Sequence, residues 1–336
     1  MTVINFDTIS NESDLLDQIY DELTTNQNWT GRRNTGTVAS NNIEVWLEKD
    51  PSDTVSGRRL LAGFLSTNAS PSANGTSYEV RLVKGDTEWD DDENAGSAED
   101  ADFDDIGDYP DNQFVRSLSF YRDEINQAWL IVPDDDDDGL QYFYCVVQAG
   151  LLYYFCFGCG EIDKSYNFAG GEFLSHSSFR TNAVNPAQRS GFLCGSVASA
   201  SSSTYTGYLY CDNGAGEVWR EIGGAGAGDA FCPHNYRGIQ VVYDDLNPST
   251  DSGQFIPFPI AYFCGITDES VATNEQLEYI GNAPFAYVTS IRFLDHGETI
   301  VISGDRYLVV PFFAVEGSPD GDSAYMGLLI RTEEDS

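Results

Sequence analysis

Lysine is almost absent from this sequence. Only Lys49, Lys84 and Lys164 occur among 17 basic residues, against 54 acidic residues, and the net charge is −37. In dilute buffer such a surface repels itself, whereas multimolar salt shortens the Debye length to about 3 Å or less. The acid is spread along the whole chain, which favours a protein that works in a halophile's cytoplasm or in brine over an ordinary acidic protein.

Clusters of positive charge are also missing. The pairs Arg32–Arg33 and Arg58–Arg59 are the only basic doublets in a chain with 54 acidic residues. A nucleic-acid ligand needs clustered cations that displace its counterions. We therefore expect no direct binding to DNA or RNA.

Targeting signals and membrane spans are not readable either. Residues 1–20 contain four acids and no apolar run, so we expect no secretory signal. The uncharged stretch Gly139–Gly160 is long enough to cross a bilayer. Its four tyrosines, two glutamines and three cysteines instead favour two strands, Leu140–Val147 and Leu151–Phe157, joined by a turn near Gln148–Gly150. We predict no membrane span.

Catalytic signatures are lacking. There is no Gly-x-Ser-x-Gly elbow, and Gly223–Gly228 has neither the Gly-x-Gly-x-x-Gly order nor a lysine. The only histidines are His176, His234 and His296, and the last lies in an expected turn at Asp295–Gly297, where a structural role is the better interpretation. Carboxylate pairs are too numerous to single out one. We assign no catalytic residue and expect no enzyme.

The seven cysteines have irregular spacing, which predicts no disulfide framework. Cys156-x-x-Cys159 has the spacing of half a zinc site. In an extended strand, residues three apart point to opposite faces. We therefore predict two packed thiols, with zinc or redox chemistry as the alternative.

The acidic run 134–138 matches the first half of a calcium-binding EF-hand loop. Asp134, Asp136 and Asp138 have the ligand spacing and Gly139 follows them, but Cys145 stands where the bidentate Glu is needed. A solvated acidic turn is the simpler interpretation. The alternative is a weak surface cation site at Asp134, Asp136 and Asp138, and we expect no cofactor beyond surface-bound Na⁺, K⁺, Mg²⁺ or Ca²⁺.

The hydrophobic pattern predicts a mainly β protein of the α+β type. Leu15, Ile19 and Leu23 predict an amphipathic helix over 11–27, capped by Asn11 or Ser13. Alternating segments then predict antiparallel sheets of a β-sandwich or barrel-like kind. The expected strands are Ile43–Leu47, Tyr78–Leu82, Val115–Tyr121, Gln127–Val132, Tyr205–Cys211, Glu217–Ile222, Gly238–Tyr243, Phe285–Leu294, Thr299–Ser303, Arg306–Val315 and Tyr325–Arg331.

Turn signals and composition organise these strands further. Arg122–Asn126 predicts a hairpin turn, and Ser303–Asp305 predicts a turn between two strands. The acidic segment 85–112 predicts a loop. The sharpest change in composition, at 133–139, divides the chain into regions 1–132 and 133–336, which can also pack as one domain.

Three blocks of this chain resemble structural proteins from the tail modules of tailed phages and haloarchaeal tailed viruses. The blocks are the Leu15–Leu23 helix with Trp29 and Ile43–Leu47; Tyr153–Lys164 with Gly170–Phe173; and Thr299–Pro311 with Tyr325–Ile330. The middle block is similar to a "Phe-Gly-Glu-Ile-Asp-Lys … Gly-Gly" segment of phage proteins. The last block is similar to the "Gly-Asp-x-Tyr-Leu-Val" strand that ends such proteins.

The resemblance implies a multicopy subunit of the tail, neck or baseplate, located in the virion and assembled in the cytoplasm of a halophilic host. Its partners would be copies of itself and other virion proteins. The alternative is a receptor-binding or decoration protein, or a glycan-acting hydrolase, on the virion surface, because tyrosine and tryptophan beside carboxylates suit sugar stacking. An ordinary halophile enzyme is a third, weaker hypothesis.

The charge predicts that folding depends on salt. Below about 0.1 M salt, screening extends to about 10 Å, and the carboxylates of the folded surface repel one another. Far-UV circular dichroism during dialysis from concentrated salt should then show loss of structure. Spectra that stay unchanged in low salt would contradict the assignment to brine.

Overall fold

The computed structural model describes the parts of the chain that carry most of the regular structure. These are residues 1–40, 42–49, 60–66, 76–83, 115–120, 125–134, 139–149, 153–166, 168, 170–177, 190–193, 195–196, 207–212, 217–222, 230–231, 257–267, 275–291, 294–311 and 326–333. Every strand pair in these ranges is antiparallel. The protein is mainly β, as predicted, with open sheets and no closed barrel among the described residues.

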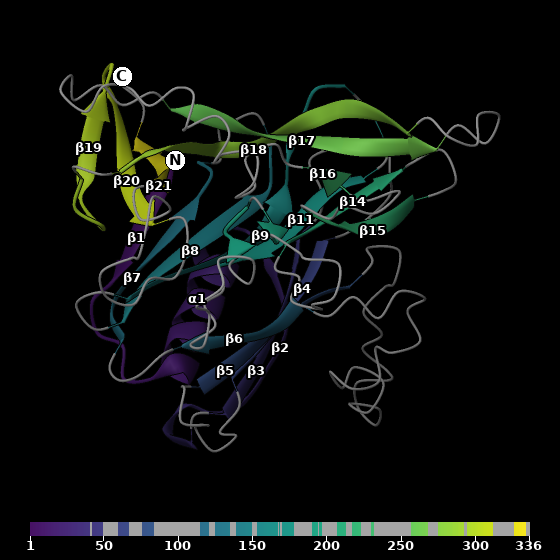
Figure 1. The fold of residues 1–336 in the computed structure, drawn as a ribbon. Helices are drawn as coiled ribbons and strands as arrows, with labels where there is room; N and C mark the ends of the chain where they lie inside the picture. The colour runs from purple at the N-terminus through teal and green to yellow at the C-terminus, as the bar shows by residue number, and fades with distance from the viewer. Residues whose placement is uncertain are drawn as a thin grey trace, which may run out of the picture.

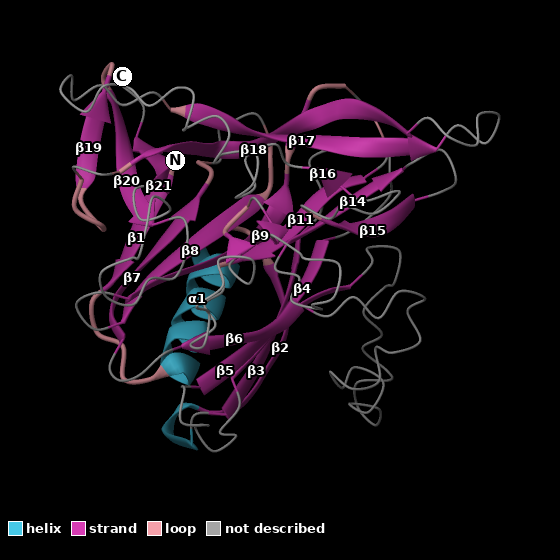
Figure 2. Cartoon of the chain, in the orientation of Figure 1, coloured by secondary structure: helices cyan, strands magenta, loops and turns pink. Residues whose placement is uncertain are grey.

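Three large sheets form the described structure (Figures 1 and 2). The central sheet has the order β1 (Thr2–Phe6), β7 (Ile125–Val132), β8 (Tyr142–Ala149), β9 (Tyr153–Glu161), β11 (Gly170–His176), β14 (Gly207–Asp212), β15 (Glu217–Glu221). The N-terminal sheet has the order β2 (Thr30–Thr37), β3 (Asn42–Lys49), β4 (Leu60–Ser66), β5 (Thr76–Val83), β6 (Val115–Phe120).

The C-terminal sheet contains β16 (Ala230–Phe231), β17 (Phe258–Thr267), β18 (Glu275–Ser290), β21 (Met326–Glu333), β20 (Asp305–Pro311) and β19 (Thr299–Ile302), in this spatial order. The short strand β10 (Asp163–Lys164) pairs with β18. Three further elements are small. They are the paired strands β12 (Ser190–Gly191) and β13 (Gly195–Ser196) and the 3-10 helix η1 (Val38–Ser40).

The central sheet is the middle layer, because both of its faces are buried. Along β8, the side chains of Tyr142, Tyr144 and Val146 belong to the core shared with the C-terminal sheet. The intervening Phe143, Cys145 and Val147 belong to the core shared with the helix and the N-terminal sheet. All six are fully buried. This explains the long uncharged stretch in the sequence, since a strand covered on both faces has no solvent-facing row.

The helix α1 (Glu12–Asn26) lies between the central and N-terminal sheets, as Figure 2 shows. Leu15, Leu16, Ile19 and Leu23 are buried there, as their spacing predicts. Asn11 is the N-cap, and its side chain accepts a hydrogen bond from the Asp14 amide at 2.9 Å. Within the described ranges, no helix combines the length and apolar composition that crossing a bilayer requires.

Most predicted strands within the described residues are confirmed, but the hairpin at Arg122–Asn126 is wrong. The strand before it, β6, pairs with β5 in the N-terminal sheet, whereas the strand after it, β7, pairs with β1 and β8 in the central sheet. Residues 128–132 of β7 are all buried. A strand buried to this extent lies inside a sheet, with a neighbouring strand on each edge. Closeness in sequence does not decide which strands become those neighbours. The strand predicted at Gly238–Tyr243 and the loop at 85–112 lie outside the described residues.

A short joint connects the central sheet to the C-terminal sheet. After β9 ends, the Ile162 amide donates to the Gly171 carbonyl at 2.8 Å, on the central-sheet side. The next residues form β10, in which Asp163 pairs with Asn282 and Lys164 with Gly281 of β18. The chain therefore crosses between the two layers within three residues, and the Gly160–Lys164 block supplies the crossing.

Gly281 is a position in this joint that tolerates no side chain. Its φ is 156°, and a Cβ built on it would lie 2.3 Å from the backbone oxygen of Asp163. We expect Gly281→Ala to separate β10 from β18 and to lower the free energy of unfolding by about 1–3 kcal/mol, the usual cost of overpacking. Denaturant unfolding in concentrated salt measures this. The matched control is Asn282→Ala in the same bridge, and equal stability of both variants would contradict the steric argument.

Candidate functional site

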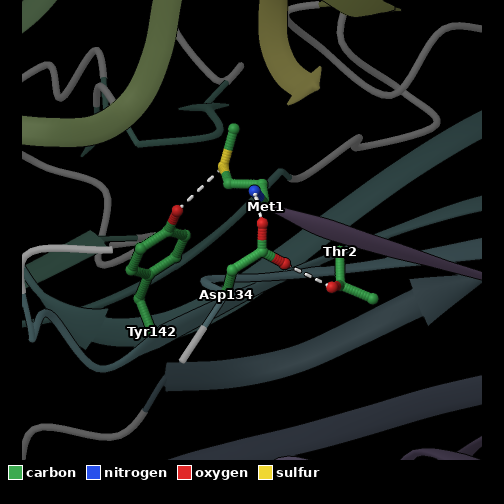
Figure 3. A network of polar contacts seen from close by, with 4 residues as sticks. All are labelled: Met1, Thr2, Asp134 and Tyr142. Carbon is green, nitrogen blue, oxygen red and sulfur yellow. Dashed lines mark hydrogen bonds and ion pairs between the residues drawn. The ribbon is translucent and has the colours of Figure 1, made fainter. Parts of the chain in front are cut away.

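Asp134, the first residue of the predicted cation site, lies just beyond β7 beside the start of β1 (Figure 3). One carboxylate oxygen accepts from the Met1 ammonium and the other accepts from the Thr2 hydroxyl. Partial burial opposes ionisation of Asp134, but these hydrogen bonds outweigh it and hold the pKa of Asp134 below its usual value. Tyr142 donates its hydroxyl to the Met1 sulfur at 2.9 Å in the same network.

Asp136 and Asp138 lie outside the described residues, so the cation site stays a prediction. No group of three or more His, Cys, Asp or Glu side chains suited to a metal occurs in the part of the chain that the structure describes. Both oxygens of Asp134 already take part in the network with Met1 and Thr2. A cation would therefore have to share this carboxylate with the strand end.

A cavity of about 180 Å³ lies next to Asp134. Lys49 reaches its wall and donates from Nζ to the carbonyls of Gln27 and Asn28, at 2.8 and 3.2 Å, just after α1. A cation at this position stabilises the carbonyl end of a helix. The lining residues are Gln27, Asn28, Trp29, Lys49, Val132, Pro133, Asp134, Gly139 and Gln141. The cavity has room for a few water molecules. Its charged side chains, Lys49 and Asp134, form hydrogen bonds to the residues just after α1 and to the start of β1.

Cys156 and Cys159 point to opposite faces of β9. Cys156 belongs to the core shared with the C-terminal sheet, and Cys159 to the core shared with α1 and the N-terminal sheet. Both are buried and neither forms a disulfide. Burial raises the pKa of both thiols well above the usual value, because the thiolate is poorly solvated there. The two sulfurs therefore cannot bind one zinc ion or form one redox pair in this strand.

His296 lies in the predicted turn after β18. Tyr154 of β9 donates its hydroxyl to the His296 carbonyl at 2.8 Å and meets the imidazole edge-on, at 5.6 Å between ring centres. Burial lowers the pKa of His296, and nearby Asp295 only partly offsets that effect. The residue thus ties the turn to the central sheet. His176 ends β11, whereas His234 and the Gly223–Gly228 segment lie outside the described residues.

Two buried glutamates that the sequence did not single out lie opposite each other on neighbouring strands of the central sheet. Glu161 and Glu172 are directly opposite in the β9–β11 register and are 1% and 6% exposed. Glu161 accepts a hydrogen bond from the Gln141 amide at 3.0 Å. Neither lines the cavity beside Asp134. Their burial separates both carboxylates from any polymeric substrate, so this pair does not form a glycosidase site in this conformation. The only sequence signal for these two glutamates was their position after Gly160 and Gly171 in the resembling blocks.

Neither a family model nor a curated protein matches this chain. The resemblance to virion structural proteins therefore stays a prediction. What the geometry adds is the position of its blocks, which lie in α1 and β3, in β9 to β11, and in β19 to β21.

The burial of the cysteine pair predicts low thiol reactivity. In the folded protein, in concentrated salt at pH 8, we expect Cys156 and Cys159 to resist alkylation by iodoacetamide, because they are inaccessible and protonated. Peptide mass spectrometry, with a denatured sample as the control, measures this. Rapid labelling of either thiol in the native protein, or stoichiometric zinc that a Cys156→Ala variant loses, would contradict the packed-thiol interpretation.

Proposed function

We propose that this protein is a multicopy structural subunit of the tail, neck or baseplate of a tailed virus that infects a halophilic host. The proposal carries no catalytic step. The protein's task is to hold a rigid shape in brine and to bind copies of itself and other virion proteins.

The observation that carries the proposal is where the resembling blocks lie. The Gly160–Lys164 block builds the joint between two sheets, and Gly170–Phe173 supplies the neighbouring strand. Thr299–Pro311 forms the β19–β20 hairpin at the edge of the C-terminal sheet. Blocks that resemble virion proteins thus build the framework and one outer edge, which suits a role in architecture more than a role in catalysis.

The charge supports the same setting. The described residues bury three carboxylates, those of Glu48, Glu161 and Glu172, whereas the chain has a net charge of −37. The other acidic side chains that the structure describes are partly or fully exposed. Such a surface keeps a subunit soluble in concentrated salt. The same salt screens the electrostatic repulsion between copies, so that they can approach one another.

The proposal predicts ordered self-assembly. Protein expressed in a halophilic host and purified in multimolar salt should form rings, tubes or discs of uniform diameter in negative-stain electron microscopy. It should also occur in fixed stoichiometry in purified virus particles. A protein that stays monomeric in concentrated salt and is missing from particles would contradict the proposal.

A glycan-binding role on the virion surface is the other candidate, and one observation favours it. Tyr166 and Tyr279 are 42% and 39% exposed. They come from neighbouring segments, because the Ser165 amide donates to the Ile280 carbonyl at 3.0 Å and the Ser165 hydroxyl to the Tyr279 carbonyl at 3.2 Å. Exposed rings on neighbouring segments suit stacking on sugars. A glycan array in high salt, in which Tyr279→Ala loses a signal that the parent protein gives, would favour this candidate.

A further inference from the structure

The outer edge of β19 lacks the residues that usually protect a sheet edge against pairing. It is the last strand of the C-terminal sheet and lies at the margin of the molecule in Figure 1. Its sequence, Thr-Ile-Val-Ile, contains no charge, proline or glycine. Natural sheets protect their edges with such residues. The central-sheet edge β15, by contrast, carries Glu217, Arg220 and Glu221.

The hydrogen-bonding groups of β19 that point outward can be identified from its register. The Val309 amide donates to the Glu298 carbonyl at 2.9 Å, just before β19. Bonded and non-bonded pairs alternate along an antiparallel ladder. Ile300 and Ile302 therefore bond to β20, and the amides and carbonyls of Thr299 and Val301 point away from the sheet.

The hairpin turn gives the same assignment independently. Ile302 and Asp305 are paired across a two-residue turn in which Ser303 and Gly304 have φ values of 56° and 105°. Positive φ at both central residues is the signature of the tight turn that closes on a hydrogen-bonded pair. With Ile302 bonded inward, Val301 must present its backbone outward.

Apolar side chains accompany this open edge. Val301 is 63% exposed, the highest value among the large hydrophobic residues in the described ranges. On the other face of the strand, Ile300 and Ile302 pack beside Tyr307 but stay partly exposed. An incoming strand would thus gain backbone hydrogen bonds and apolar contacts together.

We propose that β19 pairs with β19 of a second copy, antiparallel about a two-fold axis through Ile300. In this register Thr299 of each copy lies opposite Val301 of the other, so every outward amide and carbonyl of these two residues gains a partner. Identity of the two strands guarantees this match of donors and acceptors. The two Ile300 side chains meet at the axis and join the apolar clusters of both copies.

Charge favours a second copy at this edge. Most approaches between two chains of net charge −37 bring carboxylates together. The four residues of β19 carry none, and the positive charge of Arg306, directly opposite Val301 on β20, is offset by an ion pair with Glu333 at 3.1 Å. The inference deepens the proposed function by naming one contact between copies, and it can fail while assembly through another surface persists.

Val301→Lys tests the contact, because an ammonium on the exposed edge disfavours pairing without disturbing the core. We expect the dissociation constant for self-association, measured by sedimentation in concentrated salt, to rise about tenfold or more. The matched control is Tyr166→Lys, which places the same charge on another exposed apolar position and should associate like the parent protein. Unchanged association of Val301→Lys would overturn the pairing, and a monomeric parent would overturn it together with the proposed function.

A cross-link tests the register. Directly opposite residues in a non-hydrogen-bonded antiparallel pair have Cα atoms about 4.5 Å apart, within the range of about 4.4–6.8 Å that a disulfide spans. Ile300→Cys should therefore form disulfide-linked dimers under oxidation, whereas Val301→Cys, which faces Thr299 of the other copy, should not. Equal cross-linking of both variants, or of neither, would overturn the proposed register.

Discussion

Burial of both faces of the central sheet is the constraint on which the rest of the structure depends. Each face needs its own cover, so the chain supplies α1 and the N-terminal sheet on one side and the C-terminal sheet on the other. The ring of Phe143 illustrates this demand, since it meets Trp29 at 5.6 Å, Phe64 at 5.7 Å and Phe157 at 6.4 Å between ring centres. Such pairs add to the free energy gained from burying apolar area.

Local signals predicted part of this fold well. The helix period around Ile19, the two strands within Gly139–Gly160 and the turn at Ser303–Asp305 all depend on residues close in sequence, and the structure has each of them. The strand β2 was missed because Thr-Gly-Arg-Arg-Asn-Thr-Gly-Thr has no apolar alternation, and it forms by pairing with β3. The false hairpin before β7 has the same cause, since strand partners far apart in sequence leave no local trace.

The candidate site was harder to predict, for a related reason. Sequence spacing suggested that Cys156 and Cys159 pack separately, and the two faces of β9 confirm this. It could not pair Glu161 with Glu172, because that contact depends on the β9–β11 register. Nor could sequence spacing show that the Asp134 carboxylate accepts hydrogen bonds from Met1 and Thr2 at the start of β1. In each case the chemistry of a residue is decided by which strand lies beside it.

Native-state hydrogen–deuterium exchange in concentrated salt tests the central claim most directly. Doubly covered strands should open only when the whole molecule unfolds. The account predicts that the amides of β8 and β9 exchange slowest and share one free energy of opening, whereas those of the edge strand β15 exchange much faster. Amides of β8 that exchange as fast as those of β15 would contradict a central sheet buried on both faces.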